Sequence, residues 1–322
     1  MKSLLLISAL AVLPQAANAT GTWTRLAPAH QPSARLGMAS AYDPVSHRLV
    51  LFGGFDGSAY FADTWVFDGS DWSKLSPPAA PPVRTNAGMA YDAVSRKLIL
   101  FGGYDGNNWL GDTWAYDGAS GTWQPMQPQH PPRAGTGPAV FSDPASGHAI
   151  VYGGFDGSQT IGYSNQTLRW TGSDWTQLTV TPPSARSDAG YANDPSTRSV
   201  VLFGGLGSVN PYNSWTWHTH SWTQRTPSQM PPMRFAMGIA CDAGLSGCVL
   251  LGGDQGGLSV GDSWLWNGAT AQWSAFSATG SPGPRESFTM AYYPPAKEII
   301  VFGGLRALTH KSSLLNDTWA LR

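Results

Sequence analysis

Charged residues are scarce in this 322-residue chain. Aspartate, glutamate, lysine and arginine together make up 12% of it, about half the usual share. The formal net charge is −1 at pH 7, so there is no basic excess that would neutralise a phosphate backbone. We therefore expect no nucleic-acid partner.

Long apolar runs are missing beyond the N-terminus. The first nineteen residues carry one basic residue, Lys2, then an apolar run from Leu4 to Leu13, and they close on Ala17-Asn18-Ala19. This segment is too short to span a membrane and is typical of a secretory signal peptide. We expect residues 1–19 to be removed, the remainder to be secreted or periplasmic, and no segment to span a membrane.

Motifs of several common catalytic chemistries are also missing. There is no glycine-rich phosphate loop that opens a helix and no G-x-S-x-G motif. No histidine pair has zinc-site spacing with a third ligand on the same face, and His218-x-His220 is more typical of a polar turn. We expect no metal and no cofactor, and these absences leave open whether the protein is an enzyme.

A repeat, by contrast, runs through the whole chain. The stretch LVLFGGFDG at 49–57 returns as LILFGGYDG at 98–106 and as AIVYGGFDG at 149–157. Six diglycines, 48 to 51 residues apart, begin at residues 53, 102, 153, 204, 252 and 303. A regular period of this length indicates a radial array or a solenoid rather than separate domains.

The sequence pattern of each repeat unit predicts four strands, labelled a to d. In the first unit these are a small-residue run at 37–42, an apolar run into the diglycine, the run TWVFD at 64–68, and the run DWSKL at 71–75 that carries Trp72. Strand b is apolar without alternation, as expected of a strand covered on both faces. An arginine precedes the diglycines by eighteen residues, or by twenty in the third unit: Arg35, Arg84, Arg133, Arg186, Arg234 and Arg285.

These features together resemble the kelch family over residues 22–322. The resemblance implies an all-β fold, a six-bladed β-propeller like the central propeller of the galactose oxidase type. The last unit ends with NDTWALR and has no strand d, whereas GTWTRL at 21–26 carries the unassigned Trp23. We predict that residues 20–322 form one propeller, closed 3+1 by an N-terminal strand that completes the last blade.

The only two cysteines, Cys241 and Cys248, correspond to positions that face each other across the a–b hairpin of the first unit. An oxidising compartment favours a disulfide between them. The alternative, a thiol nucleophile or metal ligand, is less consistent with export.

A functional site is expected where the d–a connections and the b–c loops open on one face. The kelch resemblance points to three positions in each unit: after the arginine, after the diglycine, and five residues further on. The three sets are Leu36, Thr85, Ala134, Ser187, Phe235 and Glu286; Phe55, Tyr104, Phe155, Leu206, Asp254 and Leu305; and Tyr60, Trp109, Thr160, Pro211, Ser259 and His310.

Aromatic residues dominate these positions in units one to three, and ionisable residues appear in units five and six. The candidate ligand-binding residues are Phe55, Tyr60, Tyr104, Trp109, Phe155, Asp254, Glu286 and His310. Aromatic rings that face carboxylates and an imidazole across the mouth can stack a sugar or a peptide and hydrogen-bond to its polar edge. The recurring arginines favour a structural role, with an anion-binding ring as the alternative.

Three functions remain open. The first is an exported, monomeric binding module for a glycan or a peptide at the mouth of the central channel. The second is a cofactor-free sugar epimerase or lyase, resembling the periplasmic sialic acid epimerase, with Glu286, His310 or Asp254 as acid and base. The third is a structural or adhesion protein. A carboxylate pair with a shifted pKa would favour the enzyme, and a shallow neutral groove would favour the binding module.

Overall fold

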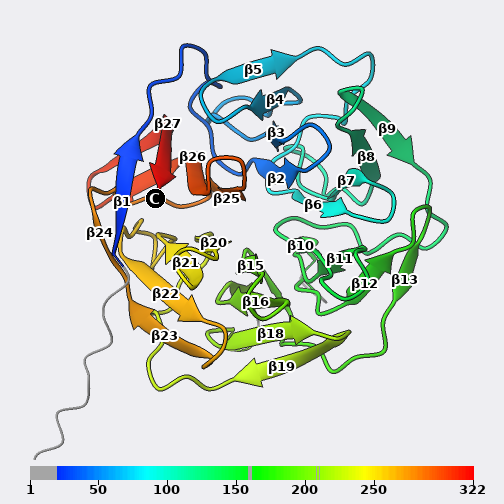
Figure 1. Cartoon of the computed structure of the whole chain (residues 1–322). Helices are drawn as coiled ribbons and strands as arrows, with labels where there is room; N and C mark the ends of the chain where they lie inside the picture. Colours follow the sequence, from blue (N-terminus) through cyan, green and yellow to red (C-terminus); the bar gives the residue numbers. More distant parts are fainter. Residues whose placement is uncertain (1–19, 159–161, 208, 210) are drawn as a thin grey trace, which may run out of the picture.

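The computed structural model describes residues 20–158, 162–207, 209 and 211–322 (Figure 1). The expected signal peptide and Thr160 lie outside these residues. Every regular element in the described part of the chain is a β-strand. Within that part, we find no helix long and apolar enough to cross a membrane.

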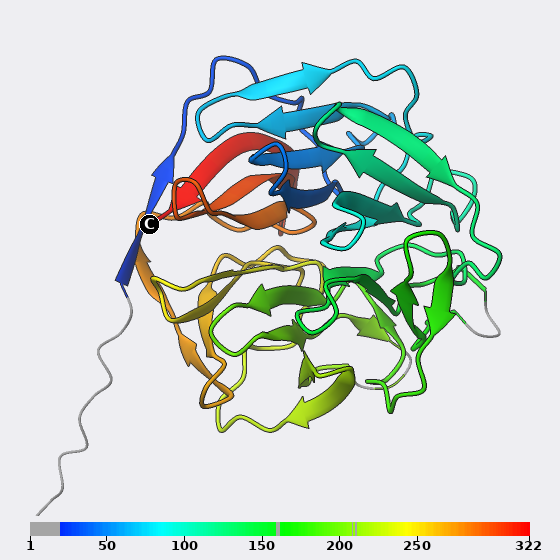
Figure 2. The ribbon, with the colours of Figure 1, turned by 45° about the vertical axis from the view of Figure 1, so that its right-hand side comes forward.

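The strands form a six-bladed β-propeller, as predicted, with one strand of each blade nearest the axis (Figures 1 and 2). From the axis outwards, the first three blades are β2 (Ala39–Asp43), β3 (Arg48–Phe52), β4 (Thr64–Phe67) and β5 (Trp72–Leu75); β6 (Gly88–Asp92), β7 (Lys97–Phe101), β8 (Thr113–Asp117) and β9 (Thr122–Met126); and β10 (Ala139–Ser142), β11 (Ala149–Tyr152), β12 (Thr167–Trp170) and β13 (Trp175–Gln177).

The other three blades follow the same order. They are β15 (Gly190–Asp194), β16 (Ser199–Phe203), β18 (Ser214–His218) and β19 (Ser221–Arg225); β20 (Gly238–Asp242), β21 (Gly247–Leu251), β22 (Ser263–Asn267) and β23 (Gln272–Ala275); and β25 (Thr289–Tyr293), β26 (Glu298–Leu308), β27 (Lys311–Leu321) and β1 (Thr20–Arg25). Two short strands, β14 (Arg186–Ser187) and β17 (Leu206–Gly207), pair with each other beside the fourth blade.

The sixth blade combines the two ends of the described chain. Strand β1 pairs antiparallel with β27, with Trp23 opposite Leu321 and Arg25 opposite Trp319, and the two strands lie side by side in both views (Figures 1 and 2). A further strand, β24 (Ser277–Thr279), leaves the fifth blade and pairs parallel with the outer edge of β1. This fifth strand was not foreseen, and it covers the edge that β1 would otherwise expose.

The diglycines bring adjacent blades into backbone contact. The N–H of Gly54 donates to the carbonyl of Arg84 in the next blade (2.9 Å), and the N–H of Gly304 donates to the carbonyl of Arg35 (2.9 Å), which joins the last blade to the first. A Cβ on Gly53 would lie 2.5 Å from that same Arg84 carbonyl oxygen, and φ at Gly53 is +71°. Only glycine fits this position, which explains why the motif recurs in every blade.

At five of the six blade boundaries, the middle residue of the DTW motif or its equivalent holds one blade to the blade that follows it. Asp63 accepts hydrogen bonds from Arg35 Nη1 (2.6 Å) and Trp65 Nε1 (2.8 Å) within the first blade. Thr64 Oγ1 accepts from Nε1 of Trp123, the strand-d tryptophan of the second blade (2.9 Å). The same bond from Trp72 to Thr318 (3.0 Å) links the first blade to the sixth. Each letter of the motif therefore has a structural partner.

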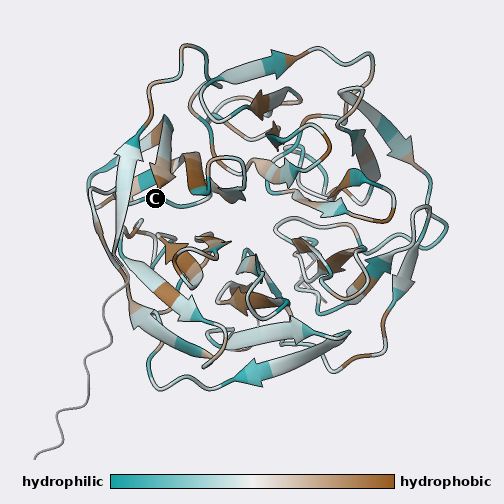
Figure 3. Cartoon of the chain, viewed as in Figure 1, coloured by the Kyte–Doolittle hydropathy of each residue, from teal (hydrophilic) through white to brown (hydrophobic). Residues whose placement is uncertain are grey.

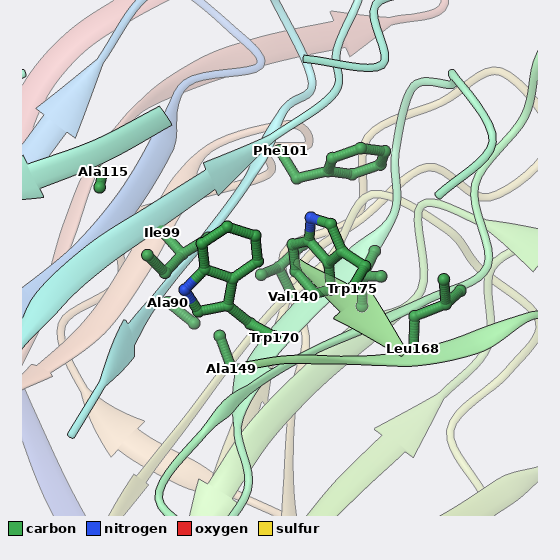
Figure 4. Packing of buried hydrophobic residues seen from close by; sticks show 10 residues of the cluster. Ala90, Ile99, Phe101, Ala115, Val140, Ala149, Leu168, Trp170 and Trp175 are labelled. Carbon is green, nitrogen blue, oxygen red and sulfur yellow. The ribbon is translucent and has the colours of Figure 1, made fainter. Parts of the chain in front are cut away.

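The core lies between the blades. The second strand of each blade, such as β16 or β21, is the most hydrophobic, whereas the outer strands β5, β9, β19 and β23 are mostly pale or hydrophilic (Figure 3). Between the second and third blades, Trp170 and Trp175 pack with Ile99, Phe101 and Val140 (Figure 4). A middle strand is thus covered on both faces, and this explains its uninterrupted apolar sequence.

Candidate functional site

The three positions expected at the mouth do come together in the second blade. Thr85 pairs with Tyr104, and Tyr104 pairs with Trp109, as isolated bridges at the start of the b–c loop. Leu36, Phe55 and Tyr60 form the same ladder in the first blade. Because each ladder directly follows a diglycine, its place is set by the contact between blades.

The third blade corrects two of the expected positions. Its ladder is Thr136–Phe155–Tyr163, and not Ala134–Phe155–Thr160. The structural equivalent of the arginine is Gly135, whose carbonyl accepts the N–H of Gly103 (2.8 Å). Tyr163 was missed because the b–c loop is longer in this blade. It stands three residues before Gln166, as Tyr60 stands three before Asp63, so counting back from the DTW position finds it.

The sixth blade corrects the position of His310. Strands β26 and β27 extend into a long hairpin in which Leu305 pairs with Leu314, so Leu314 is the third member of the ladder. His310 lies in the turn between Leu308 and Lys311 and is exposed. Three further residues of extended strand put this turn roughly 10 Å beyond Leu305. The structure therefore does not bring His310 to Glu286.

The arginines are largely architectural. Arg35, Arg84, Arg186, Arg234 and Arg285 are 0–2% exposed. In the second blade, Arg84 donates to the Gly102 carbonyl (2.9 Å) and to both Asp112 carboxylate oxygens (2.8 and 2.7 Å). Guanidinium groups buried and engaged in this way are not available to a ligand, so an anion-binding ring of these five is wrong.

Arg133 differs from the other five. It forms an ion pair with Asp156 and donates to Ser158 Oγ (3.4 Å), both in the b–c loop of its own blade. Its side chain is partly exposed. It is therefore a loop residue of the mouth rather than part of the inter-blade framework.

An aromatic belt follows the ladders of blades one to three. It consists of Phe55, Tyr60, Tyr104, Trp109, Phe155 and Tyr163. Successive ring centroids are 4.4, 6.0, 5.4, 6.4 and 4.9 Å apart, so the rings are in contact across two blade boundaries. These separations suit stacked and edge-to-face pairs. Trp109 is the most exposed member, at 38%.

The third glycine of the repeat makes room for this belt. A Cβ on Gly106 would lie 2.6 Å from the Tyr60 ring of the preceding blade. A Cβ on Gly157 would lie 2.1 Å from the Trp109 ring. The second and third copies of the nine-residue motif therefore receive the preceding blade's side chain as well as its backbone, whereas a Cβ on Gly57 of the first copy would meet only Leu314 Cδ1, at 3.9 Å.

The b–c loops add carboxylates beside the belt. Backbone N–H groups of Ala59 and Ser58 lower the pKa of Asp56, and those of Asn107 and Asn108 lower the pKa of Asp105. Both side chains are therefore ionised at neutral pH, and both stand next to belt residues. The belt itself carries no formal charge, so its edge is aromatic and weakly acidic.

An acidic pair lies in blades five and six. Burial raises the pKa of Glu286 to about 7, and the nearby Asp254 carboxylate raises it as well, while Ser259 opposes the shift. Glu286 is 7% exposed, and its Oε2 has no hydrogen-bond partner among the described residues. Asp254 Oδ1 accepts the N–H of Gly257 (2.6 Å). Glu286 is therefore a largely buried carboxyl that is partly protonated at neutral pH.

A narrow neck closes the floor of the mouth. One residue from each blade contributes its backbone, with N–H donating to the carbonyl of the preceding blade over 2.7–2.9 Å: Gly37, Asn86, Gly137, Asp188, Ala236 and Ser287. All six have φ between +51° and +68°. They line a cavity of about 140 Å³. Burial raises the pKa of Asp188, which accepts a hydrogen bond from Ser187 Oγ (2.6 Å).

The two cysteines are paired. Cys241 on β20 and Cys248 on β21 lie opposite each other in register and form a disulfide. In the described part of the chain, no three histidine, cysteine, aspartate or glutamate side chains gather as a metal site would require.

The chain also matches a family model, described as the KLHDC2/KLHL20/DRC7 Kelch-repeats domain. The match covers residues 15–205, which is more than half of the chain. It extends from the N-terminal strand into the fourth blade, and it therefore includes the whole aromatic belt.

Proposed function

The chain belongs to the kelch-repeat family, and from that premise we propose that it binds an extended peptide segment of a partner protein along the aromatic belt. Kelch propellers are typically protein-binding modules. The proposal adds which face is used and what the ligand must look like.

The continuity of the belt carries this proposal. Six rings in contact across three blades make a long surface rather than a closed pocket. Aromatic side chains supply much of the energy at protein interfaces because they bury a large area and have few rotatable bonds. A long, neutral aromatic surface suits a chain that lies across it.

The carboxylates beside the belt restrict the class of ligand further. Asp56 and Asp105 stand beside the rings and are ionised. A lysine or arginine of the ligand can stack on Trp109 or Tyr104 and also face these carboxylates. We therefore expect a segment that combines apolar residues with at least one basic residue.

A display library of random twelve-residue peptides, screened in parallel with a glycan array, tests this ligand class. We expect enrichment of basic and aromatic or aliphatic residues, and weaker binding of the selected peptides by Asp105→Asn, with Lys74→Gln as a surface control. Retention of glycans with no peptide enrichment would reassign the ligand to carbohydrate. Absence of both would contradict a binding role for the belt.

A second candidate function rests on Glu286. A carboxyl group with a pKa of about 7 beside Asp254 is suited to acid–base work in a cofactor-free epimerase or lyase. Its burial limits the access of a substrate, so we rank this function second. If it is right, Glu286→Gln abolishes turnover of a sugar substrate and leaves its affinity nearly unchanged.

We also propose that the protein is exported and works as a monomer. The N-terminal residues and the disulfide between Cys241 and Cys248 support export. Thiol titration of unfolded protein collected outside the cytoplasm should detect no free thiol, and two titratable thiols would contradict an oxidising location.

A further inference from the structure

The axis has a second opening, on the face of the a–b hairpins. A cavity of about 610 Å³ opens there, lined by the inner strand of every blade. We call this cavity the shaft. Tyr191 lines both the shaft and the neck, and therefore separates the shaft from the belt side of the molecule.

The shaft is wide because of one layer of small residues. Five of the six inner strands place an alanine at the same register position, and the third blade places Phe141 there: Ala41, Ala90, Ala192, Ala240 and Ala291. A methyl group at these positions fills far less space than the side chains above and below it. The alanines of the inner strands therefore account for the cavity.

Larger side chains close the two ends of this alanine layer. The floor is formed by Met89, Val140, Tyr191, Ile239 and Met290. The outer rim carries hydroxyl and amide groups from Tyr42, Tyr91, Ser142, Asn193 and Tyr292. The shaft thus has an apolar, polarisable inner end and a polar aromatic outer end.

Apart from Arg198 at its outer edge, the wall offers no free charge to a ligand. Asp194 is buried, and its carboxylate accepts hydrogen bonds from Ser196 Oγ (2.6 Å) and Thr197 Oγ1 (2.9 Å) in its own turn. Arg198 lies at the outermost edge and is exposed. Burial raises the pKa of Tyr191, so its hydroxyl stays protonated at neutral pH. Inside the alanine layer, a charged group of a ligand would lose its hydration without gaining a partner.

We propose that the shaft is a binding site for an uncharged aromatic small molecule with polar groups at one end. The aromatic end packs on Tyr191 and on the thioethers of Met89 and Met290, which make favourable contacts with ring edges. The polar end reaches the rim tyrosines and Asn193. The cavity volume falls in the range of small-molecule sites. This site is independent of the aromatic belt, since the two lie on opposite faces.

The dye N-phenyl-1-naphthylamine, which is uncharged and fluoresces in apolar surroundings, is a suitable probe. Titration of the full chain should give saturable binding near one dye per molecule. Ala192→Phe, which fills the alanine layer from the fourth blade, should weaken binding at least tenfold. Ala192→Ser keeps the volume and should bind nearly as wild type does, as should Trp109→Ala on the other face.

Ala41→Phe fills the same layer from the first blade and guards against a folding defect in the first variant. Thermal melts of each variant are recorded alongside the titration. Unchanged dye binding in a folded Ala192→Phe or Ala41→Phe protein would overturn the proposal, as would the absence of saturable binding by wild type. Tighter binding of the anionic dye 1-anilinonaphthalene-8-sulfonate would overturn the uncharged ligand class. Peptide binding by the belt should be unaffected by Ala192→Phe, so the proposals for the shaft and for the belt can be rejected independently of each other.

Discussion

Blades two and three use different means to present the same surface. Blade two is fixed by the buried Arg84 and its partner Asp112. Blade three has Gly135 and Gln166 at those two positions, yet it places Phe155 and Tyr163 in the belt as blade two places Tyr104 and Trp109. The ion pair therefore serves the framework of a blade and is not needed to present the belt.

Both members of the pair are replaced together in blade three, and this has a physical reason. A buried arginine with no acceptor in place of the aspartate would be costly. Blade four keeps its buried Arg186 without an aspartate because Asn213 Oδ1 (2.9 Å) and the Pro211 carbonyl (2.6 Å) accept from it. Blade three keeps Thr167, which accepts the hydrogen bond from Trp222 (3.1 Å) as Thr64 accepts from Trp123. The contact between blades thus survives the loss of the ion pair within the blade.

Removing Arg84 should give the largest effect. Arg84→Ala leaves the carboxylate of Asp112 and the Gly102 carbonyl without their donor and opens a cavity, so we expect a loss of about 3 kcal/mol in the free energy of unfolding. Arg133→Ala, in blade three, should cost less than about 0.5 kcal/mol because Arg133 lies in a partly exposed loop. Urea denaturation compares the two, and equal losses would break the distinction between them.

Glu286→Gln should have the next largest effect, at alkaline pH. Burial and Asp254 raise the pKa of Glu286 to about 7 in the folded state, so the stability linked to its protonated form is full below its unfolded pKa and is lost as pH rises through 7. The amide should therefore stabilise the protein by about 2 kcal/mol at pH 8.5 and by little at pH 4.5. Thermal melts at the two pH values measure this, and equal shifts at both would contradict the raised pKa.

Acid should reduce the difference between wild type and Arg84→Ala. Burial raises the pKa of Asp112, but the hydrogen bonds and charge of Arg84 and the Trp114 indole outweigh it and hold the pKa below its ordinary value. The stability from this carboxylate is present above the unfolded pKa, about 4, and is lost as pH falls through the folded pKa. The two proteins should converge in stability below pH 4. A constant gap down to pH 2 would mean that packing, not charge, explains the loss.

The smallest effect is expected from Gln166→Asp. This change restores the acidic residue of the motif in a blade that has no arginine at the matching position. Gln166 is exposed, so the new carboxylate stays hydrated and stability should change by less than about 0.5 kcal/mol. A large stabilisation, measured by urea denaturation, would mean that a cationic side chain other than the missing arginine lies next to residue 166, and would contradict this expectation.

The features that recur in every repeat unit could be predicted from the sequence. Positions in the b–c loops, whose lengths differ between blades, could not all be predicted. The blade order and the pairing of β1 with β27 could be predicted from the diglycines, the DTW motif and the unassigned Trp23. Both depend on backbone contacts that only certain residues allow. Counting forward from the diglycine failed in blades three and six because the b–c loops differ in length. Tyr163 and Leu314 are found only by counting back from the DTW position.

The buried arginines and the shaft show a second limit of the sequence. Recurrence favoured a structural role for the arginines, but their burial at 0–2% exposure depends on how blades stack in three dimensions. The small residues of the inner strands were recognised as strand a. That five alanines meet at one level of the axis follows only from the common register of six separate hairpins.

The binding contribution of Trp109 tests the central claim most directly. Isothermal titration of a peptide selected on wild type should give about tenfold or greater loss of affinity for Trp109→Ala, since an exposed tryptophan at the centre of an aromatic surface is a typical hot spot. Val94 is an apolar residue of the same blade on the opposite face and is even more exposed, so Val94→Ala should bind as wild type does. Equal affinity of wild type, Trp109→Ala and Val94→Ala for the peptide would contradict the assignment of the aromatic belt as the binding surface.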